Sequence, residues 1–296
     1  MFQKLSIALV PVLFSSSVFA AQVYQTLAPG AGQSEVTPYL GLGAAAGETK
    51  GTPKVTVAAG IANLGLKYYY GLAEGQSLGL EVSYSSQTAK ATGSGIADRT
   101  QKNKGLTNPT VMYKGLFETG SASIFAQLGY KFGIEKEKNN GVDLEGNAAD
   151  GQNSFLINVG AYAPVHADFI IGGYINYEKA NDGESTETNN GVDLVSQDTG
   201  GDSTVVAAFF EIPTNEYKPN ASLGYMTRGS SESKIGGSVI SKSDAVNYLI
   251  LRGSAQFPID ANMSFNPEII YQSMLSNDTF DHYGVVAASA NLRILF

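Results

Sequence analysis

Residues 281–296, DHYGVVAASANLRILF, alternate in character with a period of two and end on a phenylalanine. Side chains two apart in a β-strand lie on the same face, so this pattern predicts a strand with two different faces. The polar face holds Tyr283, Ser289, Asn291 and Arg293, and the apolar face holds Val286, Ala288, Ala290, Leu292, Ile294 and Phe296. We therefore expect a β protein whose last strand lies between water and an apolar medium.

The first twenty residues have the features of a secretory signal peptide. One early cation, Lys4, precedes an apolar stretch over 5–14, and the segment ends on Val18, Phe19 and Ala20. A membrane-spanning helix is the competing interpretation, but the stretch contains Pro11 and falls short of the ~20 apolar residues that a bilayer requires. We predict export, with cleavage after Ala20.

Composition excludes several classes of protein. The chain has 34 glycines, 16 tyrosines and 14 phenylalanines, and it has no apolar segment long enough for a membrane helix. Without Lys4, 18 basic and 27 acidic residues remain, a net charge of −9 that argues against binding nucleic acid. No cysteine is present, so closure of a sheet must supply the stability that disulfides give other exported proteins.

Alternating segments bounded by Gly, Pro, Asn and Asp predict twelve strands. They cover residues 35–45, 54–71, 77–89, 105–117, 121–134, 153–164, 168–180, 204–213, 219–229, 245–257, 263–275 and 281–296. The connections alternate between short turns and long polar loops, which is typical of a membrane barrel. We predict an all-β fold: a transmembrane antiparallel up-and-down β-barrel of about 12 strands over 35–296, with both termini periplasmic and the long loops extracellular.

The faces of the strands follow from the last residue, because a terminal phenylalanine in such a barrel points to lipid. The same parity places Phe265, Ile269 and Tyr271 outward, with Asn266, Glu268 and Gln272 inward. Outward aromatic residues then form two belts, one near the short turns and one nearer the long loops, as expected at the two membrane interfaces. Apolar side chains are expected to face lipid and polar ones an enclosed centre.

The inward face carries charged residues of both signs. The candidates that line the lumen are Lys67, Glu81, Lys114, Lys131, Glu178, Glu211, Arg252, Glu268 and Arg293. Lys67 with Glu81, and Arg252 with Glu268, are symmetric about short turns and are expected to be cross-strand neighbours, and Arg293 is expected to extend the second pair. Two interpretations stay open: a charged constriction that favours polar or zwitterionic solutes, or mutual neutralisation that stabilises a blocked barrel.

Two long loops share the hexapeptide NNGVDL, at 139–144 and 189–194, which predicts a duplicated hairpin. Both loops are acidic, and carboxylates on flexible loops are suitable ligands for calcium. The spacing matches no EF-hand pattern, so solvated loops that repel one another are the preferred explanation and no metal site is assigned.

The segment 21–34, AQVYQTLAPGAGQS, is polar and glycine-rich and precedes the first strand. It is expected to be a flexible periplasmic tail or a plug of the barrel, and the tail is preferred.

An enzymatic function is disfavoured. A hydrolase at the rim of a barrel needs a nucleophile beside a base. Of the two histidines, His166 is expected in a short turn, and His282 lies beside Asp281 at the edge of the last strand. No nucleophile motif accompanies either histidine.

The chain resembles Gram-negative outer-membrane β-barrel proteins over essentially its whole length. The resemblance lies in Val18-Phe19-Ala20 at the end of the predicted signal peptide, the alternating strands and the terminal NLRILF. One part of the chain, residues 105–134, resembles the MetA-pathway phenol-degradation family of outer-membrane proteins, whose members are presumed channels. The resemblance lies in the stretches GLTNPTVMYKGLF and SIFAQLGYKFGI. This chain has Thr107-Asn108-Pro109 where that family has a Gly-Asp turn, so no site residue or substrate is transferred.

The resemblance implies an outer-membrane location. The expected partners are outer-membrane lipid and LPS, small-molecule solutes, and the barrel assembly machinery, for which Phe296 is the assembly signal. We expect a monomeric passive channel for small solutes that needs no cofactor. The alternatives are a closed structural or adhesin-like surface barrel that acts through its acidic extracellular loops and, more remotely, a lipid hydrolase at the rim.

Overall fold

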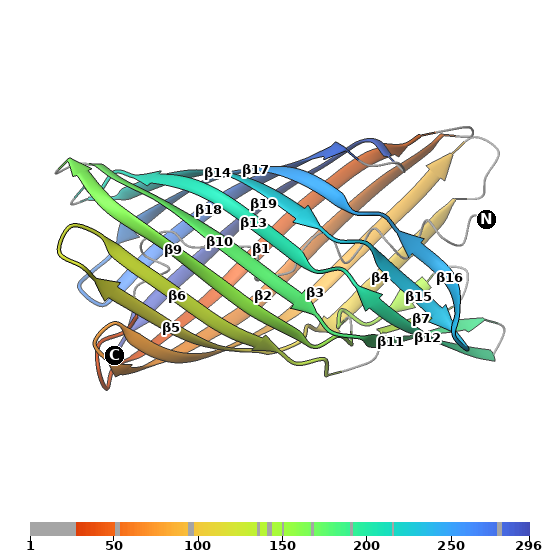
Figure 1. Ribbon diagram of the computed structural model, residues 1–296, viewed down its shortest axis with the longest axis horizontal. Coiled ribbons are helices and arrows are strands. Elements are labelled where there is room, and N and C mark those ends of the chain that lie inside the picture. Colours follow the sequence, from red (N-terminus) through yellow and green to blue (C-terminus); the bar gives the residue numbers. More distant parts are fainter. Residues whose placement is uncertain are drawn as a thin grey trace.

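The structure is a computed structural model, and it describes residues 28–50, 54–93, 98–134, 137–140, 144–149, 151–166, 169–189, 192–214, 216–276 and 280–296. All regular secondary structure in these ranges is β-strand, and the strands form a single sheet. Strand β1 pairs with both β2 and β19, so the sheet closes into a barrel (Figure 1). In the described ranges no helix is long and apolar enough to cross a membrane.

Twelve strand positions make up the wall. Its strands are β1 (Ser34–Thr49), β2 (Val55–Ala73), β3 (Gln76–Gly93), β4 (Arg99–Leu106) with β5 (Thr110–Glu118), β6 (Ser123–Lys131), β9 (Ser154–His166), β10 (Phe169–Ala180), β13 (Ser203–Glu211), β14 (Lys218–Arg228), β17 (Val246–Pro258), β18 (Met263–Ser276) and β19 (Phe280–Leu295). Neighbouring wall strands are antiparallel, so the predicted twelve-stranded antiparallel barrel is confirmed.

One predicted strand, 105–117, is divided in the structure. Strands β4 and β5 both pair with β3 and are separated by Thr107, Asn108 and Pro109. Proline has no backbone N–H and cannot donate to the strand ladder. The ladder is therefore interrupted at Pro109, and the side chain of the preceding residue, Asn108, donates a hydrogen bond to the carbonyl of Gln152 at 3.0 Å.

Three connections predicted as loops contain further strands. These are β7 (Glu137–Asn140), β8 (Leu144–Gly146), β11 (Gly183–Asn189), β12 (Val192–Gly200), β15 (Ser231–Ile235) and β16 (Ser238–Ser243). Each successive pair forms an antiparallel hairpin, β12 pairs with β15, and β7 pairs in parallel with β11. Backbone groups that a loop would leave to water are thereby paired. These six additional strands extend the wall at one end of the barrel, on the right of Figure 1.

Both NNGVDL repeats lie at the connection of such a hairpin, one joining β7 to β8 and the other joining β11 to β12. The predicted duplicated hairpin is therefore confirmed. The middle of each repeat, 141–143 and 190–191, lies outside the described residues.

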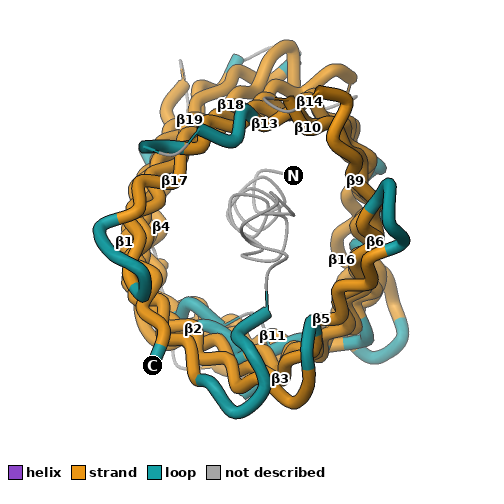
Figure 2. The backbone as a smooth tube through the Cα atoms, turned by 90° about the vertical axis from the view of Figure 1, so that its left-hand side faces the viewer, coloured by secondary structure: helices purple, strands orange, loops and turns teal. Residues whose placement is uncertain are grey.

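The start of β1 meets the end of the last strand at the short-turn end of the barrel. The backbone N–H of Ser34 donates to the carbonyl of Phe296 at 2.7 Å, and that of Phe296 donates back at 2.9 Å. Residues 28–33 dock against the end of β2, where Gly32 and Gly71 are hydrogen-bonded and Pro29 is fully buried. They turn from the rim into the barrel opening (Figure 2). The predicted signal peptide and residues 21–27 lie outside the described residues.

The strands have the predicted parity. On β18, Phe265, Ile269 and Tyr271 are exposed on the outer surface, whereas Asn266, Glu268 and Gln272 are buried inside. Large apolar side chains are exposed on the outer face of nearly every wall strand. An apolar surface this extensive is rare on a monomer in water and marks contact with an apolar environment.

Candidate functional site

A space with a cavity volume of about 100 Å³ lies against the inner wall of the barrel. Five charged side chains line it: Glu35, Lys67, Glu81, Lys114 and Arg293. Four of these are among the predicted lumen residues. Amide, hydroxyl, aromatic and a few apolar side chains from β1, β2, β5, β6, β9, β10, β18 and β19 complete the lining. Parity places all of them on the inner face, which is why residues far apart in the sequence meet here.

A salt bridge joins the first and last strands. Arg293 donates from Nε to Glu35 Oε2 at 2.8 Å, and its Nη2 lies 2.8 Å from the same oxygen. Thr37 Oγ1 also donates to Glu35, at 3.3 Å. The ion pair found for Arg293 is thus with Glu35, whereas the sequence led us to expect an extension of the Arg252 pair. Closure of the barrel brings β1 beside β19. Glu35 was not predicted as a site residue, although its inward parity on the first strand was a signal that could have identified it.

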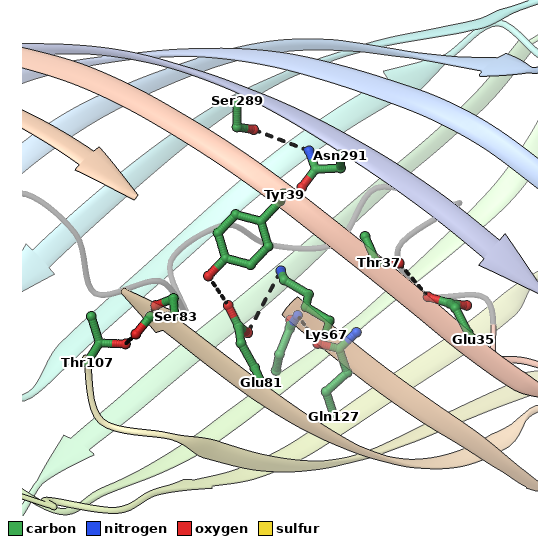
Figure 3. A network of polar contacts seen from close by, with 11 residues as sticks. Glu35, Thr37, Tyr39, Lys67, Glu81, Ser83, Thr107, Gln127, Ser289 and Asn291 are labelled. Carbon is green, nitrogen blue, oxygen red and sulfur yellow. Dashed lines mark hydrogen bonds and ion pairs between the residues drawn. The ribbon is translucent and has the colours of Figure 1, made fainter. Parts of the chain in front are cut away.

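A second network lies on β1, β2 and β3 (Figure 3). Lys67 and Glu81 are direct cross-strand partners, as predicted, and Lys67 Nζ lies 3.8 Å from Glu81 Oε2. Tyr39 Oη donates to the other oxygen, Glu81 Oε1, at 2.9 Å. Lys67 Nζ also lies 5.2 Å from the centre of the Tyr39 ring. The carboxylate of Glu81 is therefore held by a cation on one side and a hydroxyl on the other.

The inward tyrosine rings lie against the wall on glycines of the next strand. A Cβ at Gly65 would lie 2.3 Å from the Tyr39 ring, and a Cβ at Gly79 would lie 2.2 Å from the Tyr69 ring. Only glycine leaves room for the rings in this position. Lys114 Nζ lies 3.7 Å from the centre of the Tyr69 ring, a close cation–π contact. These aromatic residues were not predicted from the sequence as site residues.

The remaining predicted charges lie elsewhere on the inner wall. Lys131 and Glu178 form an ion pair of 3.0 Å across strand β9, on a diagonal of the ladder, because Lys131 lies beside Ser154 and Glu178 beside Leu156. Arg252 lies 3.6 Å from Glu268, on the diagonal of the ladder rather than directly opposite, because the register places Arg252 beside Ile270.

Glu211 is buried on β13 beside Asn220 of β14. It lies apart from the charged residues around the space, which are on β1, β2, β3, β5 and β19.

The interior is not uniformly polar, which corrects the expectation of an apolar outside and a hydrophilic inside. A row of register partners runs across the strands and carries Ala45, Val285, Gln272, Ile250, Gly224, Ala207, Tyr174, Gly160, Phe125 and Leu116. Most of its members belong to one buried apolar cluster. Alternation assigns a side chain to a face, but both faces here accept apolar residues.

The two histidines lie at opposite rims. His166 is the last residue of β9 rather than part of a turn. His282 is exposed at the other rim, where it is the register partner of Glu48 in the β1–β19 ladder. Beside it, Lys54 Nζ bridges Glu48 Oε1 at 2.9 Å and Asp281 Oδ2 at 3.3 Å. Within the described ranges, no three His, Cys, Asp or Glu side chains gather as they would around a metal ion.

No family model and no curated protein matches the chain. Among solved structures, it resembles the COG4313 outer membrane channel from Pseudomonas putida F1, with 10% sequence identity and a TM-score of 0.68, over 94% of this chain and 100% of that chain. It also resembles the transport unit of the autotransporter AIDA-I from Escherichia coli, with 14% identity and a TM-score of 0.58, over 94% of each chain. At these identities the likeness concerns the fold.

Proposed function

We propose that the protein spans the outer membrane of a Gram-negative bacterium as a monomer and is a passive channel for small solutes. The observation that carries the proposal is a space inside a closed wall, lined by charged and hydrogen-bonding side chains, beneath an apolar outer surface. The charged and hydrogen-bonding side chains inside the barrel can replace part of the hydration shell of a polar solute, which the apolar outer surface cannot do. The COG4313 barrel that this chain resembles is described as an outer membrane channel, which supports the proposal.

The balance of charges also favours passage. With Glu35 added, the predicted lumen residues comprise five cations and five carboxylates, and most lie in pairs across the ladder. Paired charges on the wall create a transverse field without a large net charge, so neither cations nor anions are strongly excluded.

Export and assembly complete the proposal. A signal peptide is cleaved after Ala20, the short-turn end is periplasmic, and LPS and lipid surround the barrel. Phe296 is the signal read by the barrel assembly machinery, and its exposed ring and its backbone pairing with Ser34 suit that role.

Deleting Phe296 should therefore lower the amount of protein at the cell surface more than it lowers refolding in detergent. It removes two backbone hydrogen bonds at the rim, while the rest of the β1–β19 ladder remains. Surface labelling of cells and gel mobility of refolded protein measure the two effects. Normal surface levels of the truncated protein would contradict the assembly role.

A closed surface barrel is the second candidate. The hairpins β11–β12 and β15–β16 extend the wall at the end opposite the short turns, and they offer a structured surface for a binding partner. An enzyme is not proposed, and unchanged lipid turnover after His282→Ala would agree with that.

Single-channel recording in planar bilayers tests the proposed function. A channel gives discrete current steps in KCl, and liposomes that contain it swell in isotonic small solutes. A correctly folded protein that gives neither steps nor swelling would refute the channel and favour the closed barrel.

A further inference from the structure

The inner wall over β5, β6, β9 and β10 is divided into rows that alternate in chemistry. One register row is polar: Lys114, Gln127, Asn158 and Asn176 are successive partners across the four strands. Lys114, Asn158 and Asn176 are each more than nine-tenths buried in the barrel, and all four side chains line the enclosed space. Asn158 Nδ2 donates to Gln127 Oε1 at 3.4 Å. The row is thus a strip of amides that begins at a lysine.

The next row on the same face is apolar where it lines the space. Met112, Gly129 and Leu156 are successive partners on β5, β6 and β9. A Cβ at Gly129 would lie 3.1 Å from Met112 Cγ and 3.2 Å from Leu156 Cβ, so the two apolar side chains close over the glycine from both sides. Rows two residues apart along a strand are separated by ~7 Å. An apolar patch therefore lies about one short alkyl chain away from the amide row.

The charges around the space leave an excess of positive charge. Lys67, Lys114 and Arg293 are cationic, whereas Glu35 and Glu81 are anionic. Cations and amide N–H groups together suit a carboxylate, since hydrogen bonds to an ionised acceptor are stronger than neutral ones.

We infer that this space is a binding site for small monocarboxylates with an apolar body, and that it selects them from other solutes of the channel. The carboxylate lies at Lys114 and the amide row, and the apolar body lies on Met112 and Leu156. The inference rests on the proposed channel function for its role in passage, but the site itself is a property of the folded barrel.

Three probes separate the two halves of the site. Hexanoate has the charge and the apolar body, acetate has only the charge, and hexanamide has the same body without the charge. In single-channel recordings in KCl, hexanoate is expected to interrupt the current at a concentration about tenfold or more below that of acetate or hexanamide, since each half contributes binding energy.

Variants locate the site. Lys114→Gln should raise the half-blocking concentration of hexanoate about tenfold by removing a charged hydrogen-bond donor. Leu156→Asn should do the same for hexanoate and leave acetate unchanged. Arg252→Gln is the matched control, because it removes one positive charge from the inner wall at a side chain that does not line this space. It should shift the hexanoate response by less than twofold.

Equal potency of hexanoate and acetate on the wild-type protein would overturn the inference. An Arg252→Gln effect as large as that of Lys114→Gln would also overturn it, because net charge rather than a site would then explain the block. If the wild-type protein gives no current steps, the channel proposal fails, and calorimetric titration of hexanoate into the folded protein in detergent decides the site. Binding that Lys114→Gln abolishes supports it, and no binding refutes it.

Discussion

The two faces of strand β18 show how differently the outside and the inside of this barrel are built. Outward, Ile269 and Tyr271 are exposed apolar side chains like those on the neighbouring strands. Inward, Glu268 is ion-paired with Arg252, and two residues along the strand the wall changes to Ile270, a member of the apolar cluster. The outer face meets a single environment and is uniform. The inner face is divided into charged, amide and apolar areas, so any selectivity must come from it.

The largest effect is expected from a charge on the outer face. Ile269→Arg should destabilise the barrel by about 2–4 kcal/mol if this position lies near the bilayer midplane. Asn266→Arg, an inward position on the same strand that lines the charged space, should cost much less, because this part of the interior already holds charges. Urea unfolding in lipid vesicles, followed by far-UV circular dichroism because the chain has no tryptophan, measures both. Equal losses in the two variants would break the distinction between the faces.

The next effect concerns the rings held against the inner wall. Gly65→Ala places a methyl group where the Tyr39 ring lies, so the ring must leave the wall and its hydrogen bond to Glu81. Overpacking of this kind costs about 1–3 kcal/mol.

Gly41→Ala on the neighbouring strand is the matched control, because the nearest atom to its new Cβ is 3.8 Å away. Gel mobility after graded heating compares the two variants. Similar melting of both would show that the ring does not depend on the glycine.

The salt bridge between the first and last strands should have a smaller effect. Glu35→Gln removes the charge that faces Arg293 but keeps a hydrogen-bond acceptor, so we expect a loss of about 1–2 kcal/mol. The double variant with Arg293→Met should recover part of that loss, because no cation is then left without its carboxylate. Urea unfolding of the single and double variants gives the coupling energy. Additive losses would show that the pair does not contribute to closure.

Sequence alone predicted the architecture because a membrane barrel has a simple rule on its outer face. Parity from Phe296 placed Ile269 outward and Glu268 inward, and short turns set the pairing of Lys67 with Glu81. The partner of Arg293 was missed because it depends on closure between segments far apart in the sequence. Pairing inside a hairpin is local, whereas pairing across the seam depends on the register of the whole barrel.

The amide row and the tyrosines of the site were missed for a related reason. Asn158 and Asn176 look like ordinary inward polar residues until the register of β6, β9 and β10 places them in one line. The position of the Tyr69 ring depends on Gly79 of the next strand, and many other glycines in this sequence give the same signal. The NNGVDL repeat predicted two of the loop hairpins, but the pairing of β7 with β11 and of β12 with β15 was missed because it depends on the positions of neighbouring hairpins.

The smallest expected effect tests the inner face without disturbing the fold. Arg252→Gln removes an inward cation and leaves the carboxylate of Glu268 without it, so the lumen becomes more negative. The reversal potential in a KCl gradient should therefore move toward that of K⁺, by a shift that shrinks at high salt as the charges are screened. The neutral substitution Gln256→Asn, inward on the same strand, should leave the reversal potential unchanged. An unaltered reversal potential in a conducting Arg252→Gln protein would place this pair outside the ion path and restrict selectivity to the cluster around Lys114.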